Sequence, residues 1–194
     1  MHRKTAPAVR NGRVAKKNNW RESRALDPSV VEVVRRRPHA GYRHLLTKAD
    51  VARFLALLPE WDDLAIGLNQ VVLGAGDEAA MGWHEPGIVA VEAWEAAHWW
   101  NDVLASFVTE HDGLLRRLGV EQRTTRGRIV LEWTEPQARA FQLLHVLTHE
   151  LGHHHDRMTT RSQRRASRGE GYAEAYARTH GDRLWHDYVS AFGI

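Results

Sequence analysis

The hydrophobic positions of the chain change their spacing several times, and each spacing predicts one type of element. Apolar residues that recur every three or four positions predict helices, and short apolar runs broken by glycine predict strands. Asp27-Pro28 is typical of a helix start, with an N-cap followed by proline. The expected helices cover 29–36, 48–58, 92–118, a stretch that begins at 135, and 169–189, and the expected strands cover 64–73, 87–91 and 128–133.

This mixture of helices and strands, without an internal repeat, predicts a single α+β domain over residues 25–194. Residues 1–24 show no apolar period, so we expect a basic arm that is disordered or loosely docked. Residues 1–48 carry 13 Lys and Arg against three acids, whereas residues 49–194 carry a net charge of −7. A basic arm on an acidic body can contact nucleic acid, although a solvated tail is the simpler interpretation.

Composition excludes several classes of protein. No apolar run is long enough for a membrane span, and no apolar stretch follows the N-terminal charges as in a secretory signal, so we expect a cytoplasmic protein. The chain has no cysteine, which excludes disulfides, thiolate metal sites and a cysteine nucleophile. It has 13 histidines, so any transition-metal site must be built from imidazole and carboxylate.

One motif suggests such a site. His149-Glu150-Leu151-Gly152-His153 is an HExxH sequence inside an expected helix. Residues four apart lie about 40° apart around a helix axis, so His149 and His153 can share one metal ion. Zn²⁺ suits two imidazoles with a third protein ligand and a water, and Glu150 can take a proton from that water.

A third ligand is available in the next expected helix. Glu170 and Glu174 share a face with small residues only, namely Ala173, Ala177 and Gly181. Such a face allows a second helix to approach closely. One carboxylate can then reach the metal while the other accepts a hydrogen bond from a ligand imidazole.

HELGHHHD followed by EGYAEAYA resembles the gluzincin zinc metallopeptidases over about residues 141–184. The pattern is closest to the minimal members: the CAAX-prenyl-protease and heat-shock peptidase group, the neutral zinc peptidases and the phage-antirepressor peptidases. The resemblance implies His149, His153 and Glu170 as ligands and Glu150 as general base. It places Glu174 where the family has Asp or Asn, beside a ligand imidazole, with Glu174 as the alternative third ligand. The metzincin pattern is not met, because Asp156 and Thr159 replace the required glycine and histidine.

The resemblance also implies a zincin-like fold, in which a small antiparallel or mixed sheet packs on the HExxH helix and on the following Glu-bearing helix. Residues 82–91 resemble the sheet edge that zincins place beside the metal, where an extended peptide can add as a strand. His84 lies in this segment and can enter the cleft, although a turn histidine is the simpler interpretation. Tyr172, Tyr176 and His180 are candidate donors to a transition-state oxyanion.

Other residues near the motif are interpreted more simply. His145 and Asp156 share the ligand face of the helix and can line the cleft or bond a ligand, or they can serve as structural polar groups. His154 and His155 are expected at the surface. The arginine-rich stretch 157–168 is expected to be a solvated connector, and Trp94, Trp99 and Trp100 are expected in the core.

The leading hypothesis is therefore a zinc-dependent peptidase that acts on peptide or protein substrates. Two alternatives stay open at this point. One is a DNA-associated regulatory protein with a zincin-like domain, and the other is a catalytically silent zincin that binds metal.

Overall fold

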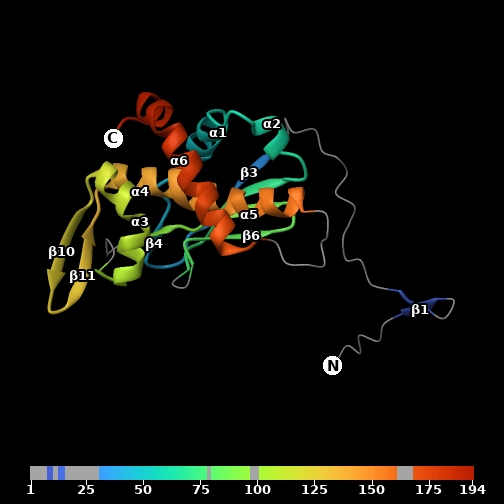
Figure 1. The fold of residues 1–194 in the computed structure, drawn as a ribbon, viewed down its shortest axis with the longest axis horizontal. Coiled ribbons are helices and arrows are strands. Elements are labelled where there is room, and N and C mark those ends of the chain that lie inside the picture. Colours follow the sequence, from blue (N-terminus) through green and yellow to red (C-terminus); the bar gives the residue numbers. More distant parts are fainter. Residues whose placement is uncertain (1–7, 11–12, 16–30, 78–79, 97–100, 161–167) are drawn as a thin grey trace.

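The chain folds around a mixed four-stranded sheet that packs against a long helical run (Figure 1). The structure is a computed structural model that describes residues 8–10, 13–15, 31–77, 80–96, 101–160 and 168–194. The expected mixed α+β class is confirmed. No helix among these residues combines the length and apolar character needed to cross a bilayer.

The sheet has the strand order β3-β5-β7-β6. Its strands are β3 (Glu32–Arg35), β5 (Gln70–Leu73), β7 (Ile88–Val91) and β6 (Gly82–Glu85). The first three run parallel, and β6 pairs antiparallel with β7 at one edge. The middle strands are almost entirely apolar and buried, as expected of parallel strands covered on both faces.

The helical run covers residues 135–159 without a break. It consists of α4 (Glu135–Phe141), the π-helical segment η2 (Gln142–Leu147) and α5 (Thr148–Thr159). Thr134 begins the run with a capping box to Gln137. In Figure 1 this run extends across the molecule next to β6, and α6 (Glu170–Phe192) crosses it.

Smaller elements complete the fold. Helix α1 (Lys48–Leu55) begins at a Thr47–Asp50 capping box, and α3 (Ala105–Leu118) ends at Gly119, which adopts the left-handed conformation (φ 70°). The remaining elements are β1 (Ala8–Arg10), β2 (Arg13–Ala15), β4 (Tyr42–Arg43), α2 (Trp61–Leu64), β8 (Trp94–Glu95), β9 (Asn101–Val103), β10 (Glu121–Thr125) and β11 (Arg128–Glu132). Strands β1 and β2 pair within the expected basic arm, and the other residues of the arm lie outside the described residues.

Three sequence-based element predictions were wrong. The helix expected over 29–36 is strand β3 where the structure describes it, because its paired valines fit a place beside β5. The helix expected over 92–118 begins only at Ala105, since Trp94 lies in β8 and packs edge-on against Trp133. Of the strand expected over 64–73, only β5 is extended. Strand β10 was not expected, because all five of its side chains are exposed and polar.

Candidate metal centre

Helices α5 and α6 meet at a glycine within the HExxH motif. A Cβ at Gly152 would lie 3.0 Å from Ala173 Cα, so a larger residue there would push the two backbones apart by a few tenths of an ångström. Ala173 and Ala177 are buried, and Gly181 packs against the Leu144 carbonyl of η2. The small-residue face predicted for α6 is confirmed, and it brings the carboxylates of α6 against the histidines of α5.

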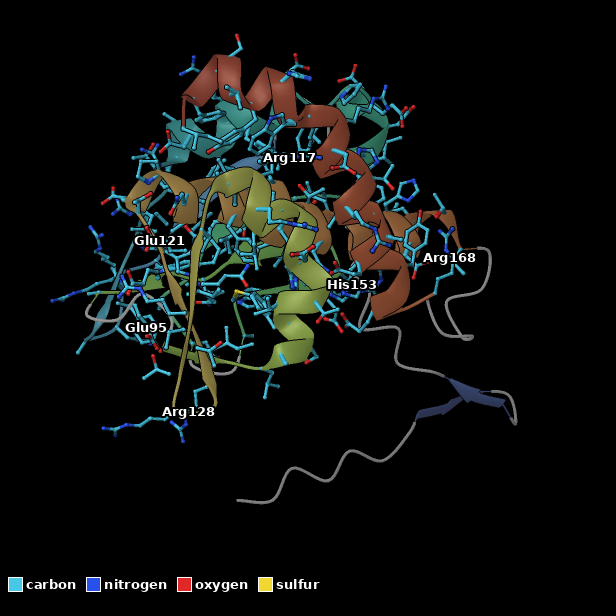
Figure 2. The ribbon with its side chains drawn as sticks, turned by 60° about the vertical axis from the view of Figure 1, so that its left-hand side comes forward. Glu95, Arg117, Glu121, Arg128, His153 and Arg168 are labelled. Atoms are coloured by element: carbon cyan, nitrogen blue, oxygen red, sulfur yellow. The ribbon has the colours of Figure 1, made fainter. Side chains whose placement is uncertain are left out.

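Two histidines and one glutamate form what we call the outer cluster: His149, His153 and Glu170. The Nε2 atoms of His149 and His153 lie 3.2 Å apart. Glu170 places Oε2 3.2 Å from His149 Nε2 and Oε1 3.4 Å from His153 Nε2. Figure 2 shows His153 near the N-terminal end of α6, where Glu170 is the first helical residue.

Glu150 is buried beside this cluster and faces edge strand β6. A Cβ at Gly82 of β6 would lie 2.8 Å from Glu150 Oε1, so the glycine leaves room for the carboxylate. Burial raises the pKa of Glu150 to about 7. The like charge of Glu170 also raises this pKa, whereas the neighbouring His149 lowers it. A carboxyl group with a pKa in this range can both accept and return a proton near neutral pH.

Glu174 contacts the other ring nitrogen of His149. Its Oε2 lies 3.3 Å from His149 Nδ1, as an ion-pair contact and not as an aligned hydrogen bond. Burial alone would lower the pKa of His149, but the carboxylates of Glu174, Glu150 and Glu170 outweigh it and raise this pKa. Glu170 therefore faces the Nε2 atoms of both His149 and His153. Glu174 contacts the other ring nitrogen of His149.

His84 lies on β6, so the turn interpretation was wrong. Its ring stacks on that of His153, with centroids 4.4 Å apart, and its Nδ1 lies 3.7 Å from Glu150 Oε2. Burial, together with the neighbouring His153, lowers the pKa of His84 to about 4. His84, Glu150 and His153 each offer an atom within 4.8 Å of the other two, so His84 belongs to the surroundings of the outer cluster.

A second group, which we call the inner cluster, consists of His111, His145 and Glu174. The Nε2 atoms of His111 and His145 lie 2.8 Å apart, and Glu174 Oε2 lies 3.7 Å from His145 Nε2. Burial, and then the proximity of His111, lowers the pKa of His145 to about 3. The sequence places His145 on the ligand face of its helix but does not mark His111 as a possible ligand. The pairing of α3 with η2 brings the two histidines together.

Both clusters open into one cleft of about 780 Å³. Its described lining includes five histidines and four glutamates, and neither lysine nor arginine. These are His84, His111, His145, His149 and His153, with Glu110, Glu150, Glu170 and Glu174. The cleft is therefore rich in metal-ligand atoms and in negative charge.

Asp156 lies outside the cleft and anchors the start of α6. Its buried carboxylate accepts hydrogen bonds from Arg168 Nε at 2.7 Å and from the Gly169 backbone N–H at 3.2 Å. Burial alone would raise the pKa of Asp156, but these hydrogen bonds and that from Thr160 lower it. Of the two roles considered for Asp156, the structure supports the structural one, which positions Glu170 two residues after Arg168.

Several sequence candidates do not line the cleft. Tyr172 contacts His155 through a 2.7 Å hydrogen bond between its hydroxyl group and Nδ1, and Tyr176 stacks on His180. His154, which was expected at the surface, is buried and bonds the Ile66 carbonyl.

Two further expectations fall partly outside the described residues. Trp94 is buried in the core, whereas Trp99 and Trp100 lie outside the described residues. Most of the arginine-rich connector, residues 161–167, lies outside them as well.

We also compared the whole chain with known proteins. No protein-family model, curated protein or solved structure matches it.

Proposed function

We propose that this chain is a zinc-dependent peptidase with a zincin-like arrangement of sheet and helices. The observation that carries the proposal is the geometry of the outer cluster. Two ligand atoms in a tetrahedral zinc site, each about 2.0–2.1 Å from the metal, lie about 3.3 Å from each other. The three separations among His149, His153 and Glu170 are 3.2, 3.2 and 3.4 Å.

The donor set also fits this ion. Two imidazoles and one carboxylate are the ligands of many catalytic zinc sites, which keep a fourth position for water or substrate. Glu174, on the far side of the His149 ring, fits the outer-shell role of holding that imidazole in place. When bound, zinc polarises a carbonyl group and lowers the pKa of water.

Residues of the chain beside the outer cluster then have separate roles in the proposed reaction. Glu150 accepts the proton of the attacking water and returns it to the leaving amine, since its buried carboxylate faces the cleft next to the outer cluster. We assign Glu150 to proton transfer and not to the metal, although its carboxylate also lies within 4.8 Å of donor atoms of His84 and His153. His84 stacks on His153 and so restrains the orientation of that ring.

Edge strand β6 supports a peptide as the substrate. Among the residues that the structure describes, it pairs with β7 on one side only, and it borders the cleft through Gly82, Trp83 and His84. An extended peptide can pair with the open edge of a strand through main-chain hydrogen bonds. This would hold a scissile carbonyl beside Glu150 and the outer cluster.

The test uses the full-length protein, with zinc content and peptide hydrolysis measured on the same samples. Zinc content is determined by elemental analysis, and hydrolysis with a broad peptide library before and after chelation. We expect hydrolysis that chelation abolishes and added Zn²⁺ restores. His149→Gln should lose zinc from the outer cluster and all hydrolysis. His186→Gln, which changes an exposed histidine of α6, should behave as the unmodified protein.

Two results would contradict the proposal. The first is an unchanged zinc content in the His149→Gln protein, which would show that the zinc ligands are elsewhere. The second is the absence of cleavage by zinc-loaded protein across the whole library, which would leave a metal-binding protein without peptidase activity.

A further inference from the structure

We propose that the inner cluster, His111, His145 and Glu174, binds a second divalent cation of the zinc class in the same cleft. This inference does not rest on peptidase activity, since it concerns metal binding by three residues that the proposed reaction does not use as ligands. Glu174 links the two clusters, through His145 on one side and His149 on the other.

The donor atoms already converge. His111 Nε2, His145 Nε2 and a Glu174 oxygen all lie within 4.8 Å of one another. Two of these separations, 2.8 Å between the imidazoles and 3.7 Å from His145 to Glu174, lie on either side of the roughly 3.3 Å expected for tetrahedral zinc. The third separation, from His111 Nε2 to Glu174, is at most 4.8 Å, so the Glu174 carboxylate has to move toward His111 to complete the site.

His111 is held in the tautomer that a metal ligand requires. Its Nδ1 lies 2.7 Å from the Phe107 carbonyl oxygen, and because a carbonyl group can only accept, Nδ1 carries the proton. Its Nε2 then presents a lone pair to the cluster. An imidazole that donates its other N–H to a backbone carbonyl is the usual arrangement around metal-ligating histidines.

Packing fixes the same ring in place. The His111 ring stacks on Phe107 with centroids 4.2 Å apart, and it meets the edge of Phe141 at 5.7 Å. The His145 ring stacks on Phe141, with centroids 5.0 Å apart. Both imidazoles are more than nine-tenths buried, so the binding geometry is largely formed before any ion arrives.

The charge of the cleft supports a second cation. Four carboxylates line it, and none of its described lining residues is a lysine or an arginine. One divalent ion at the outer cluster would leave part of this negative charge without a counter-ion inside a partly buried cleft. A second ion at the inner cluster would neutralise it, and the cleft provides the entry path.

The experiment is a metal titration of the full-length protein that has been stripped with a chelator. Zn²⁺ binding is followed by calorimetry, and Co²⁺ binding by its visible absorption, which reports the coordination geometry of each ion. We expect about two equivalents for the unmodified protein and for His186→Gln. His111→Gln should bind about one equivalent, His153→Gln about one, and the double variant none. Circular dichroism monitors folding, and His145→Gln replaces His111→Gln if the latter does not fold.

The outcomes separate this inference from the proposed function. Saturation of the unmodified protein at one equivalent would overturn the second site, as would two equivalents that both His111→Gln and His145→Gln retain. One equivalent that only His153→Gln removes would leave the outer cluster as the sole site. Conversely, loss of one equivalent in His111→Gln but none in His153→Gln would support the inner site and reject the outer one.

Discussion

The outer and inner clusters contain the same residue types, two histidines and one glutamate, but they differ in exposure. The Glu170 side chain of the outer cluster is 83% exposed, whereas that of Glu174 is 27% exposed. His111 and His145 lie among aromatic rings, whereas His149 and His153 adjoin Glu150 and β6. An open coordination position suits catalysis, and an enclosed one suits a structural ion. The difference in exposure therefore predicts that catalysis takes place at the outer cluster and not at the inner one.

The strongest test of this difference is Glu150→Gln. The amide has nearly the same shape as the carboxylate but cannot accept a proton, so hydrolysis should fall by about 10²–10⁴-fold while zinc binding at both clusters is retained. Steady-state hydrolysis and zinc content are measured on the same preparation. Glu121→Gln, a change in the exposed strand β10, is the matched control.

Hydrolysis by the Glu150→Gln protein within about threefold of the unmodified rate would reject general base catalysis by this residue. Loss of zinc from that variant would instead make Glu150 a ligand. Either result would remove the distinction between a catalytic outer cluster and an inner cluster without a base.

The second test ranks the two carboxylates for the outer metal. Glu170→Ala should lose most zinc from the outer cluster, because it removes a ligand that faces both Nε2 atoms. Glu174→Ala should lower affinity there by about 10–100-fold, as for residues that only orient a ligand. Both are measured in a His111→Gln background, so that the outer cluster alone titrates. The reverse ranking would make Glu174 the third ligand.

Local patterns in the sequence predicted the part of the site that lies on α5 and α6. His149 and His153 are four residues apart, so helical geometry alone turns them to one side. Glu170 and Glu174 follow from the small-residue face of α6 in the same way. The close contact at Gly152 is consistent with a glycine inside the motif. In each case the relevant neighbours lie on a single element or on the next helix.

The remaining features depend on contacts between distant segments. His84 enters the cleft because β6 pairs with β7 at the sheet edge, and His111 meets His145 because α3 packs near η2. The sequence before β3, Asp27-Pro28, resembles a helix start, whereas β3 itself is extended and pairs with β5. The π-helical segment η2 has an ordinary apolar period, so its wider turn leaves no distinct local signal.

A third prediction concerns Asp156, which anchors the start of α6 and hence Glu170. Asp156→Asn should lower the free energy of unfolding by about 1–2 kcal/mol at pH 7. This estimate extends below the range of about 1.5–3 kcal/mol for hydrogen bonds to charged groups, because Arg168 is half-exposed. Urea unfolding measures the change, and the outer cluster should lose more zinc affinity than the inner one. Asp182→Asn, which removes an exposed ion pair with Arg117, is the control.

The pH dependence of this effect has a definite sign. Because the pKa of Asp156 is lowered in the folded state, its contribution is present above the unfolded value of about 3.9 and is lost as the pH falls through the folded value. The difference between the two proteins should therefore be constant from about pH 7 to 5 and shrink below about pH 4. A difference that grows on acidification would contradict the anchoring role.

The smallest expected effect tests whether η2 positions the two clusters relative to each other. Thr148 is fully buried between His145 and His149, and its hydroxyl group donates to the Leu143 carbonyl, five residues earlier, at 2.9 Å. Thr148→Val fills the same space without a donor, so we expect a loss of about 1 kcal/mol in the free energy of unfolding. Thr109→Val removes a similar 2.9 Å bond to Ala105 on the exposed face of α3 and should change stability by less than about 0.5 kcal/mol. Equal effects of the two changes would show that the buried hydroxyl group does not stabilise the wide turn. A larger effect at Thr148, accompanied by weaker zinc binding at both clusters, would show that one π-helical turn positions the inner and outer histidines together.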